Sequence, residues 1–149
     1  ALSSIKSEAN QMKKAADAVT AIDYDKTSGD AVYSKVKDLV NTYNALAKQT
    51  GKSDLVSISQ SRTWMVNDTK AHEVQWNKIG ITIEDDQTLT IDEKKFKEAS
   101  TSDIKNFLSG ASGYASRLST KANGFYQLAS NQLTLNSGTS LYNKYGLLG

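Results

Sequence analysis

The 149-residue sequence contains no cysteine, no proline and a single histidine, His72. Without cysteine the chain has no disulfide scaffold, no thiolate metal site and no thiol nucleophile. One histidine leaves little metal or proton-relay chemistry. Proline breaks helices, and average usage would place about seven prolines in a chain of this length, so their absence favours long uninterrupted helices.

Net charge is also low, because 18 basic and 16 acidic side chains nearly cancel to +2. Such a balance produces no strong field for nucleic acid or an anionic lipid surface. No apolar run approaches 18 residues, which argues against a membrane span, and the amino terminus lacks the layout of a signal peptide. We expect one domain over residues 1–149 with no nucleic-acid partner, no membrane span, no small-molecule substrate and no cofactor.

Apolar residues in the first segment follow a heptad pattern. They are spaced three, four, three, four and three residues apart: Leu2, Ile5, Ala9, Met12, Ala16 and Val19. This spacing predicts a helix over about residues 1–22 with a left-handed, coiled-coil-like contact. An ordinary bundle helix and a specialised oligomeric coil both fit the pattern.

The period of the apolar residues changes once in the rest of the chain. Between residues 81 and 91 isoleucine and leucine alternate with threonine, which predicts a short β-hairpin. Elsewhere we expect helices over about residues 30–50, 54–79, 92–100, 102–109 and 112–134, followed by a tail over 136–149. Trp64 and Trp76 are expected to be core or hairpin-packing anchors. The predicted fold is a mainly α, elongated antiparallel helical bundle with coiled-coil-like packing and one small β-hairpin.

The polar residues form no constellation typical of an active site. Asp68, four residues before His72, is placed to accept a hydrogen bond from it, but no second histidine or cysteine is available for a metal or nucleophile site. Acidic residues cluster at 84–86 and around Tyr24 without the ligand spacing of a calcium loop. We therefore assign no catalytic, cofactor-binding or metal-binding residue.

Two groups of apolar residues are candidates for contact with another protein. The first is the heptad seam of the opening helix, and the second is the tail, which either packs back on the bundle or contacts another chain. The candidate interaction residues are Leu2, Ile5, Met12, Val19, Leu141, Tyr142, Tyr145, Leu147 and Leu148.

Three stretches carry a resemblance to a known family. "VKDLVNTYNALAKQTG", "IGITIEDDQTLTIDEKKFKEA" and "STSDIKNFLSG" resemble the carboxy-terminal region of the flagellar filament cap protein, the hook-associated protein of the filament tip. The matching residues are Val40, Tyr43, Asn44 and Leu46, then Gly80, Ile81, Thr82, Leu89, Thr90, Asp92 and Glu93, then Ile104, Phe107, Leu108 and Gly110. Gln87 replaces the family's turn glycine, so we expect a longer or differently shaped turn.

The resemblance implies a non-enzymatic assembly protein of a flagellar or flagellin-like axial structure. Its helices would pack against copies of itself or against flagellin-like subunits. Relatives carry a large β-rich head for which 149 residues leave no room, so the likeness concerns the helical stem. The family's location would be extracellular, at a bacterial flagellum or cell surface. The alternative is a cytoplasmic helical adaptor or export-chaperone-like module that holds a partner helix in a groove; an enzyme ranks third.

Overall fold

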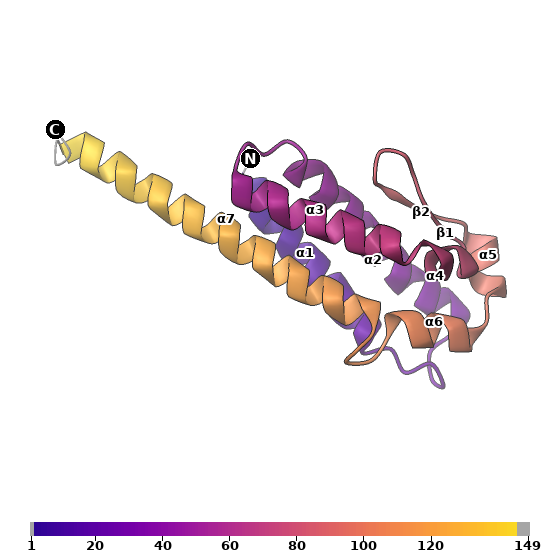
Figure 1. Ribbon diagram of the computed structural model, residues 1–149. Helices are drawn as coiled ribbons and strands as arrows, with labels where there is room; N and C mark the ends of the chain where they lie inside the picture. Colours follow the sequence, from indigo (N-terminus) through magenta and orange to yellow (C-terminus); the bar gives the residue numbers. More distant parts are fainter. Residues whose placement is uncertain (1, 146–149) are drawn as a thin grey trace.

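The computed structural model describes the backbone of residues 2–145 and the side chains of residues 2–137. Figure 1 shows a helical bundle with a hairpin at one end and a long helix that projects from the other. The elements are α1 (Leu2–Thr20), α2 (Gly29–Thr50), α3 (Val56–Ala71), α4 (Glu73–Lys78), β1 (Ile81–Ile83), β2 (Leu89–Ile91), α5 (Glu93–Glu98), α6 (Thr101–Leu108) and α7 (Tyr114–Tyr145). The prediction of a mainly α chain with one small β-hairpin is confirmed.

The core of the bundle lies where α1 packs against α7 and α2. Contacts near the two ends of α1 define its direction: Ser119 Oγ of α7 donates to Asp17 Oδ1, and Leu2 and Asn136 line the same depression. The two helices are therefore antiparallel. In the first half of α7 a buried residue recurs at every third or fourth position: Leu118, Ala122, Phe125 and Ala129. The alanines allow α1 to approach closely.

The helix expected over residues 54–79 is two helices, α3 and α4. They meet at His72, whose backbone (φ −108°, ψ 23°) departs from helical geometry. The chain bends there, and α4 brings Trp76 and Ile79 into the core beside β1. No glycine or proline marks this bend. The sequence therefore contains no helix-breaking residue that predicts this bend.

The predicted boundary near residue 134 is wrong, because α7 continues to Tyr145 and residues 136–145 form no separate tail. Asparagine, serine, threonine and glycine are weak helix formers, but none of them prevents a helix as proline does. Side chains also support the later turns: Gln132 donates to Asn136 at 3.0 Å, and Thr134 donates to the Ser130 carbonyl at 3.0 Å. These weak helix formers lower the stability of the helix without ending it.

The β-hairpin is held on the bundle by Asn44 of α2. Its side-chain amide donates to the Leu89 carbonyl at 2.8 Å, and its side-chain oxygen accepts from the Leu89 N–H at 2.7 Å. A side chain thus pairs with one backbone residue of β2 as a neighbouring strand would. A two-stranded hairpin is marginal by itself, so this attachment and the burial of Ile81 and Leu89 are what stabilise it.

The hairpin turn contains a strained residue. Gln87 has φ 74°, and its N–H donates to the Glu84 carbonyl at 3.0 Å, so the turn closes with a left-handed residue. Glycine adopts this conformation without steric cost, whereas other L-residues do not. The turn has the shape that a glycine would favour, and glutamine bears the strain.

Gln87→Gly is therefore expected to stabilise the protein by about 0.5–1 kcal/mol, the left-handed penalty less the entropy that glycine loses on folding. The midpoint of urea unfolding would measure the gain. Gln87→Ala removes the same side chain but keeps the penalty, so it should give no increase. Equal gains from both variants would mean that the side chain, not the backbone, is responsible.

Candidate functional site

The heptad seam of α1, proposed as an interaction surface, lies inside the chain. Ile5 is 1% exposed, and Met12 and Val19 are fully buried against neighbouring helices. Leu2 is half-buried at the end of the bundle. A heptad spacing does not reveal whether the facing helix belongs to the same chain, and here α7 and α2 occupy the seam. These residues hold the bundle together and leave no free apolar stripe on α1.

The candidate residues near the carboxy terminus are placed only in part. Leu141, Tyr142 and Tyr145 belong to α7 by their backbone, while their side chains lie outside the described residues. Leu147 and Leu148 lie outside the described residues altogether. The expectation that this segment contacts another chain stays a prediction.

A buried hydroxyl chain joins three helices of the bundle. Tyr43 of α2 donates to Thr69 Oγ1 of α3 at 3.0 Å, and the Thr69 and Tyr114 hydroxyls are 2.7 Å apart. Thr69 is 1% exposed although its side chain is polar. The pairing satisfies each hydroxyl, so this network costs little to bury and fixes how α2, α3 and α7 meet.

Beside this network the α3–α4 bend is packed with aromatic rings. Trp76 meets Phe107 and Tyr114 edge to face, with ring centroids 4.9 and 5.2 Å apart, and His72 lies 5.2 Å from Tyr114. Trp76 is 1% exposed and is the core anchor that was expected. Trp64 is not, because 72% of it is exposed. The bundle buries the neighbouring Met65 and Val66, so Trp64 faces outward with Lys121 over its ring.

His72 lies where α3 contacts α7. Its Nδ1 lies 2.8 Å from the Asp68 backbone carbonyl, whereas the expected carboxylate contact is longer, at 3.9 Å. Arg117 of α7 pairs instead with the Asp68 carboxylate and reaches His72 Nε2 at 3.4 Å. The cluster thus ties α3 to α7. Among the described residues no group of three or more histidines, cysteines or acids is arranged to hold a metal ion.

Burial of the hydroxyl network predicts sensitivity to alkali. Burial raises the pKa of Tyr43 to about 12 and also raises the pKa of Tyr114, because the phenolate would lose its hydration. Both groups are neutral in the folded protein, while an unfolded tyrosine ionises near pH 10. Stability is therefore fully present below pH 10 and is lost as the pH rises from 10 toward 12.

The shift of Tyr43 alone corresponds to a loss of about 2–3 kcal/mol over that interval. Urea unfolding at a series of pH values, with tyrosinate absorbance as a second signal, would measure it. Tyr43→Phe should be less stable at pH 7, since Thr69 loses a partner, and should lose less stability between pH 10 and 12. An unchanged alkaline slope in this variant would contradict the assignment.

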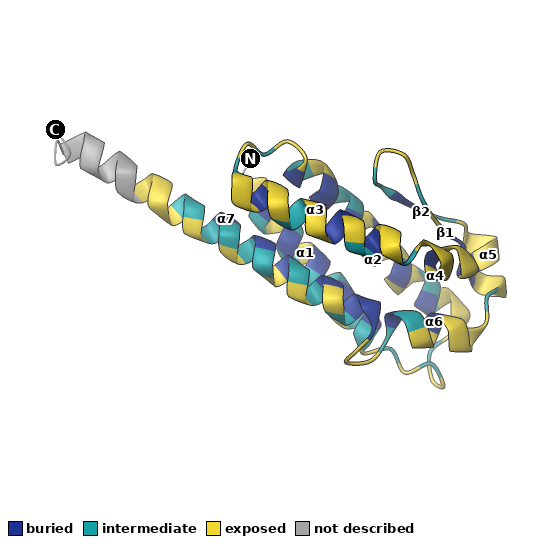
Figure 2. Cartoon of the chain, viewed as in Figure 1, coloured by how far each residue is buried: buried dark blue, intermediate teal, exposed yellow. Residues whose placement is uncertain are grey.

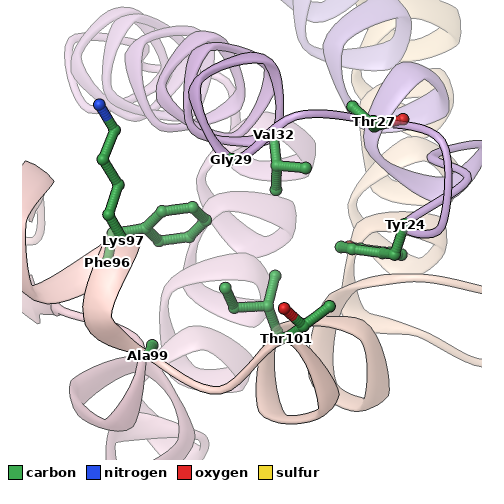
Figure 3. A pocket seen from close by; sticks show the side chains of 9 residues that line it. Tyr24, Thr27, Gly29, Val32, Phe96, Lys97, Ala99 and Thr101 are labelled. Atoms are coloured by element: carbon green, nitrogen blue, oxygen red, sulfur yellow. The ribbon is translucent and has the colours of Figure 1, made fainter.

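A cavity of about 90 Å³ lies between the start of α2 and the α5–α6 junction. Figure 3 shows Phe96 and Val32 directed toward it, while the Lys97 side chain extends away. Lys97 is paired with Asp30 at 2.6 Å, and the Tyr24 hydroxyl is paired with Ser109 at 2.6 Å. Drug-sized ligands occupy pockets of about 300–1,000 Å³. The cavity is too small for such a ligand.

The surface most distinct from the rest is the projecting part of α7. Figure 2 shows buried residues where α7 crosses α1 and exposed ones farther along the helix. The last fully buried side chain among the described residues is Ala129, whereas Leu135 is 63% exposed. Leu135 is one of four large hydrophobic side chains that the described part of the chain exposes, and the other three, Val56, Trp64 and Val74, lie on α3 and α4. We take the α7 extension, defined as residues 130–145, as the candidate functional surface.

No helix in the described part of the chain has the length and hydropathy needed to cross a membrane. Comparisons with protein-family models, with curated proteins and with solved structures give no match to this chain.

Proposed function

We propose that this chain is a non-enzymatic structural protein that assembles through helix–helix contacts, as the stem of a flagellar cap-like or flagellin-like axial structure outside the cell. The observation that carries the proposal is the α7 extension, in which the residues from Thr134 to Ser137 are all exposed, with Leu135 at 63%. Leu2 and Asn136 line the same depression at one end of the bundle, and the backbone of α7 is helical up to Tyr145. A helix gains most of its stability from packing against a neighbouring element, so an exposed helical segment is stabilised when a second helix packs on it.

Contacts with other helices hold the first half of α7 rigidly in the bundle. The seam between α1 and α7, the hydroxyl network of Thr69 and the Asp68–Arg117 pair all hold the base of α7 in place. A helix can present its surface to a partner in a defined orientation only when its first turns are fixed. The bundle therefore fixes the orientation of the α7 extension.

The residues that carry the family resemblance also have structural roles here. Asn44 holds β2, Gly80 and Gly110 adopt left-handed backbone conformations, and Asp92 accepts from the Lys95 N–H to cap α5. Each of these roles concerns how the helices and hairpin join. The shared motif is thus a folding motif, which fits a resemblance to a structural stem more than to a catalytic site.

Sedimentation velocity over a concentration series tests the proposal. Self-assembly predicts that the sedimentation coefficient rises with concentration. Flagellin-like subunits mixed with the chain would supply the second arm, because an axial partner should form a faster complex with it. A chain that stays monomeric at high concentration and ignores such subunits would contradict the proposal. A one-to-one complex with a single exported client would instead favour the adaptor or chaperone alternative.

A further inference from the structure

The side chains that join α3 to α7 at the α3–α4 bend include the single histidine of the sequence. His72 lies between Asp68 of α3 and Arg117 of α7. The His72 side chain is 27% exposed and that of Arg117 is 50% exposed, so protons reach the imidazole and the guanidinium is free to move into water. Histidine is the side chain whose charge ordinarily changes between about pH 5 and pH 8. Because the sequence has no other histidine, side-chain protonation in this range is expected at this junction.

The two polar contacts of the imidazole determine which nitrogen carries the hydrogen. Nδ1 lies 2.8 Å from the Asp68 backbone carbonyl, which can only accept, so Nδ1 is the donor. Nε2 lies 3.4 Å from Arg117 Nη1, and a guanidinium can only donate, so Nε2 accepts with its lone pair. Both contacts together require a neutral imidazole with its hydrogen on Nδ1.

A proton on Nε2 would change the contacts of Arg117. Two donors would then face each other, and two positive charges would be close together, since Nε2 and Nη1 are 3.4 Å apart. The Asp68 carboxylate attracts both cations through the same oxygen: Oδ1 pairs with Arg117 Nη2 and lies 3.9 Å from His72 Nδ1. A charged His72 therefore competes with Arg117 for this oxygen, and the half-exposed guanidinium is the partner able to leave.

The other elements packed around His72 bring no further charge into ion-pair contact with it. Phe107 of α6 contributes an uncharged ring, and Tyr114 of α7 contributes a phenol whose pKa is raised by burial and which stays neutral in this range. Among the described residues, neither Glu73 of α4 nor Asp103 of α6 comes within 4.0 Å of an imidazole nitrogen. Asp68 and Arg117 are therefore the charged groups that decide how the junction responds to a proton.

We propose that these three side chains form a proton-dependent link between α3 and α7, in which neutral His72 accepts from Arg117 and protonated His72 displaces Arg117 from Asp68. The buried hydroxyl network does not titrate in this range, so α3 and α7 stay together and the change is confined to Arg117 and the first turns of α7. The exchange alters contacts more than stability, because the carboxylate attracts both cations. The inference does not rest on the proposed function, since it concerns contacts within one chain.

Nuclear magnetic resonance of the ¹⁵N-labelled chain between about pH 8 and about pH 5.5 tests the link. At the upper pH the imidazole should give the signals of the Nδ1–H tautomer. As His72 takes up its proton, the Arg117 Nε–H signal should shift with the same midpoint, whereas the Trp64 indole N–H signal should not. In His72→Gln, whose amide stays neutral, the Arg117 signal should be independent of pH. An Nε2–H tautomer, or an Arg117 signal that does not follow the histidine, overturns the inference.

Two further variants measure the competition for the Asp68 carboxylate. Arg117→Gln removes the neighbouring positive charge, so the midpoint of the His72 titration should rise by about half a pH unit or more, which is about a threefold gain in proton affinity. Asp68→Asn removes the attracting carboxylate and should lower the midpoint by a similar amount.

Lys121→Gln is the matched control for Arg117→Gln. It also removes one positive charge from α7, but Lys121 lies over the Trp64 ring, so the midpoint of the His72 titration should not change. Dispersed amide signals would establish that each variant is folded. Equal midpoints in the unmodified chain, Arg117→Gln and Asp68→Asn would overturn the inference, because the three charges would then not interact.

Discussion

Trp76→Ala is expected to lower the free energy of unfolding by about 3–5 kcal/mol, the usual cost of removing a large buried aromatic side chain. Trp76 is 1% exposed and contacts Phe107 and Tyr114 edge to face at the point where α4, α6 and α7 meet. Its removal would leave a cavity that three elements border. Because a domain is stable by only about 5–15 kcal/mol, the variant should be near its folding limit. Urea unfolding followed by circular dichroism would measure the loss.

The second tryptophan supplies the control for this measurement. Trp64 is 72% exposed and contacts Lys121 across its ring at 5.5 Å, so Trp64→Ala should cost less than about 1 kcal/mol. Trp64→Phe would also leave Trp76 as the only indole, and its fluorescence should be that of a buried indole. Equal losses from the two alanine variants would show that the α3–α4 bend is not where the structure places it.

Gly80→Ala is expected to destabilise the protein by about 2–5 kcal/mol, for two reasons that add. The residue has φ 82°, a left-handed conformation that alanine adopts only at a cost. A β-carbon would also lie 2.8 Å from the Phe96 backbone nitrogen and 2.9 Å from Lys95 Cβ. The first turn of α5 cannot move away easily, because Asp92 also donates its N–H to the Gly80 carbonyl at 2.9 Å.

Gly110 separates the two contributions. Its φ of 87° is similar, but an added β-carbon would meet nothing within 4 Å. Gly110→Ala should therefore show the backbone penalty alone, about 1–2 kcal/mol. The shift in the midpoint of chemical unfolding measures both variants under the same conditions. Equal costs at Gly80 and Gly110 would mean that the packing of α5 against Gly80 contributes nothing.

The elements with strong local signals were predictable. The apolar seam of α1 and the alternating residues of the hairpin each place apolar side chains on one side of a regular element. The spacing of apolar residues in the sequence is enough to predict that side. Asp92 was expected to begin a helix and does cap α5. Local rules succeeded wherever neighbouring residues by themselves determine the geometry.

The joints between elements were not predictable in the same way. The bend at His72 has no helix-breaking residue, and the polar side chain of Thr69 is buried between two tyrosines. The two hydrogen-bond partners of Thr69, Tyr43 and Tyr114, are 26 and 45 positions away in the sequence. No local pattern states that a polar side chain will find its hydrogen-bond partners at such a separation.

The sequence by itself determined that the chain is mainly helical, where its hairpin lies and which stripe of α1 is apolar, because these properties follow from the spacing of neighbouring residues. Only the tertiary structure decided that α7 fills the seam of α1, that Trp64 is exposed while Trp76 is buried, and that α7 continues beyond the bundle. These outcomes depend on which distant segments compete for the same apolar surface. That competition is settled by packing across the whole chain.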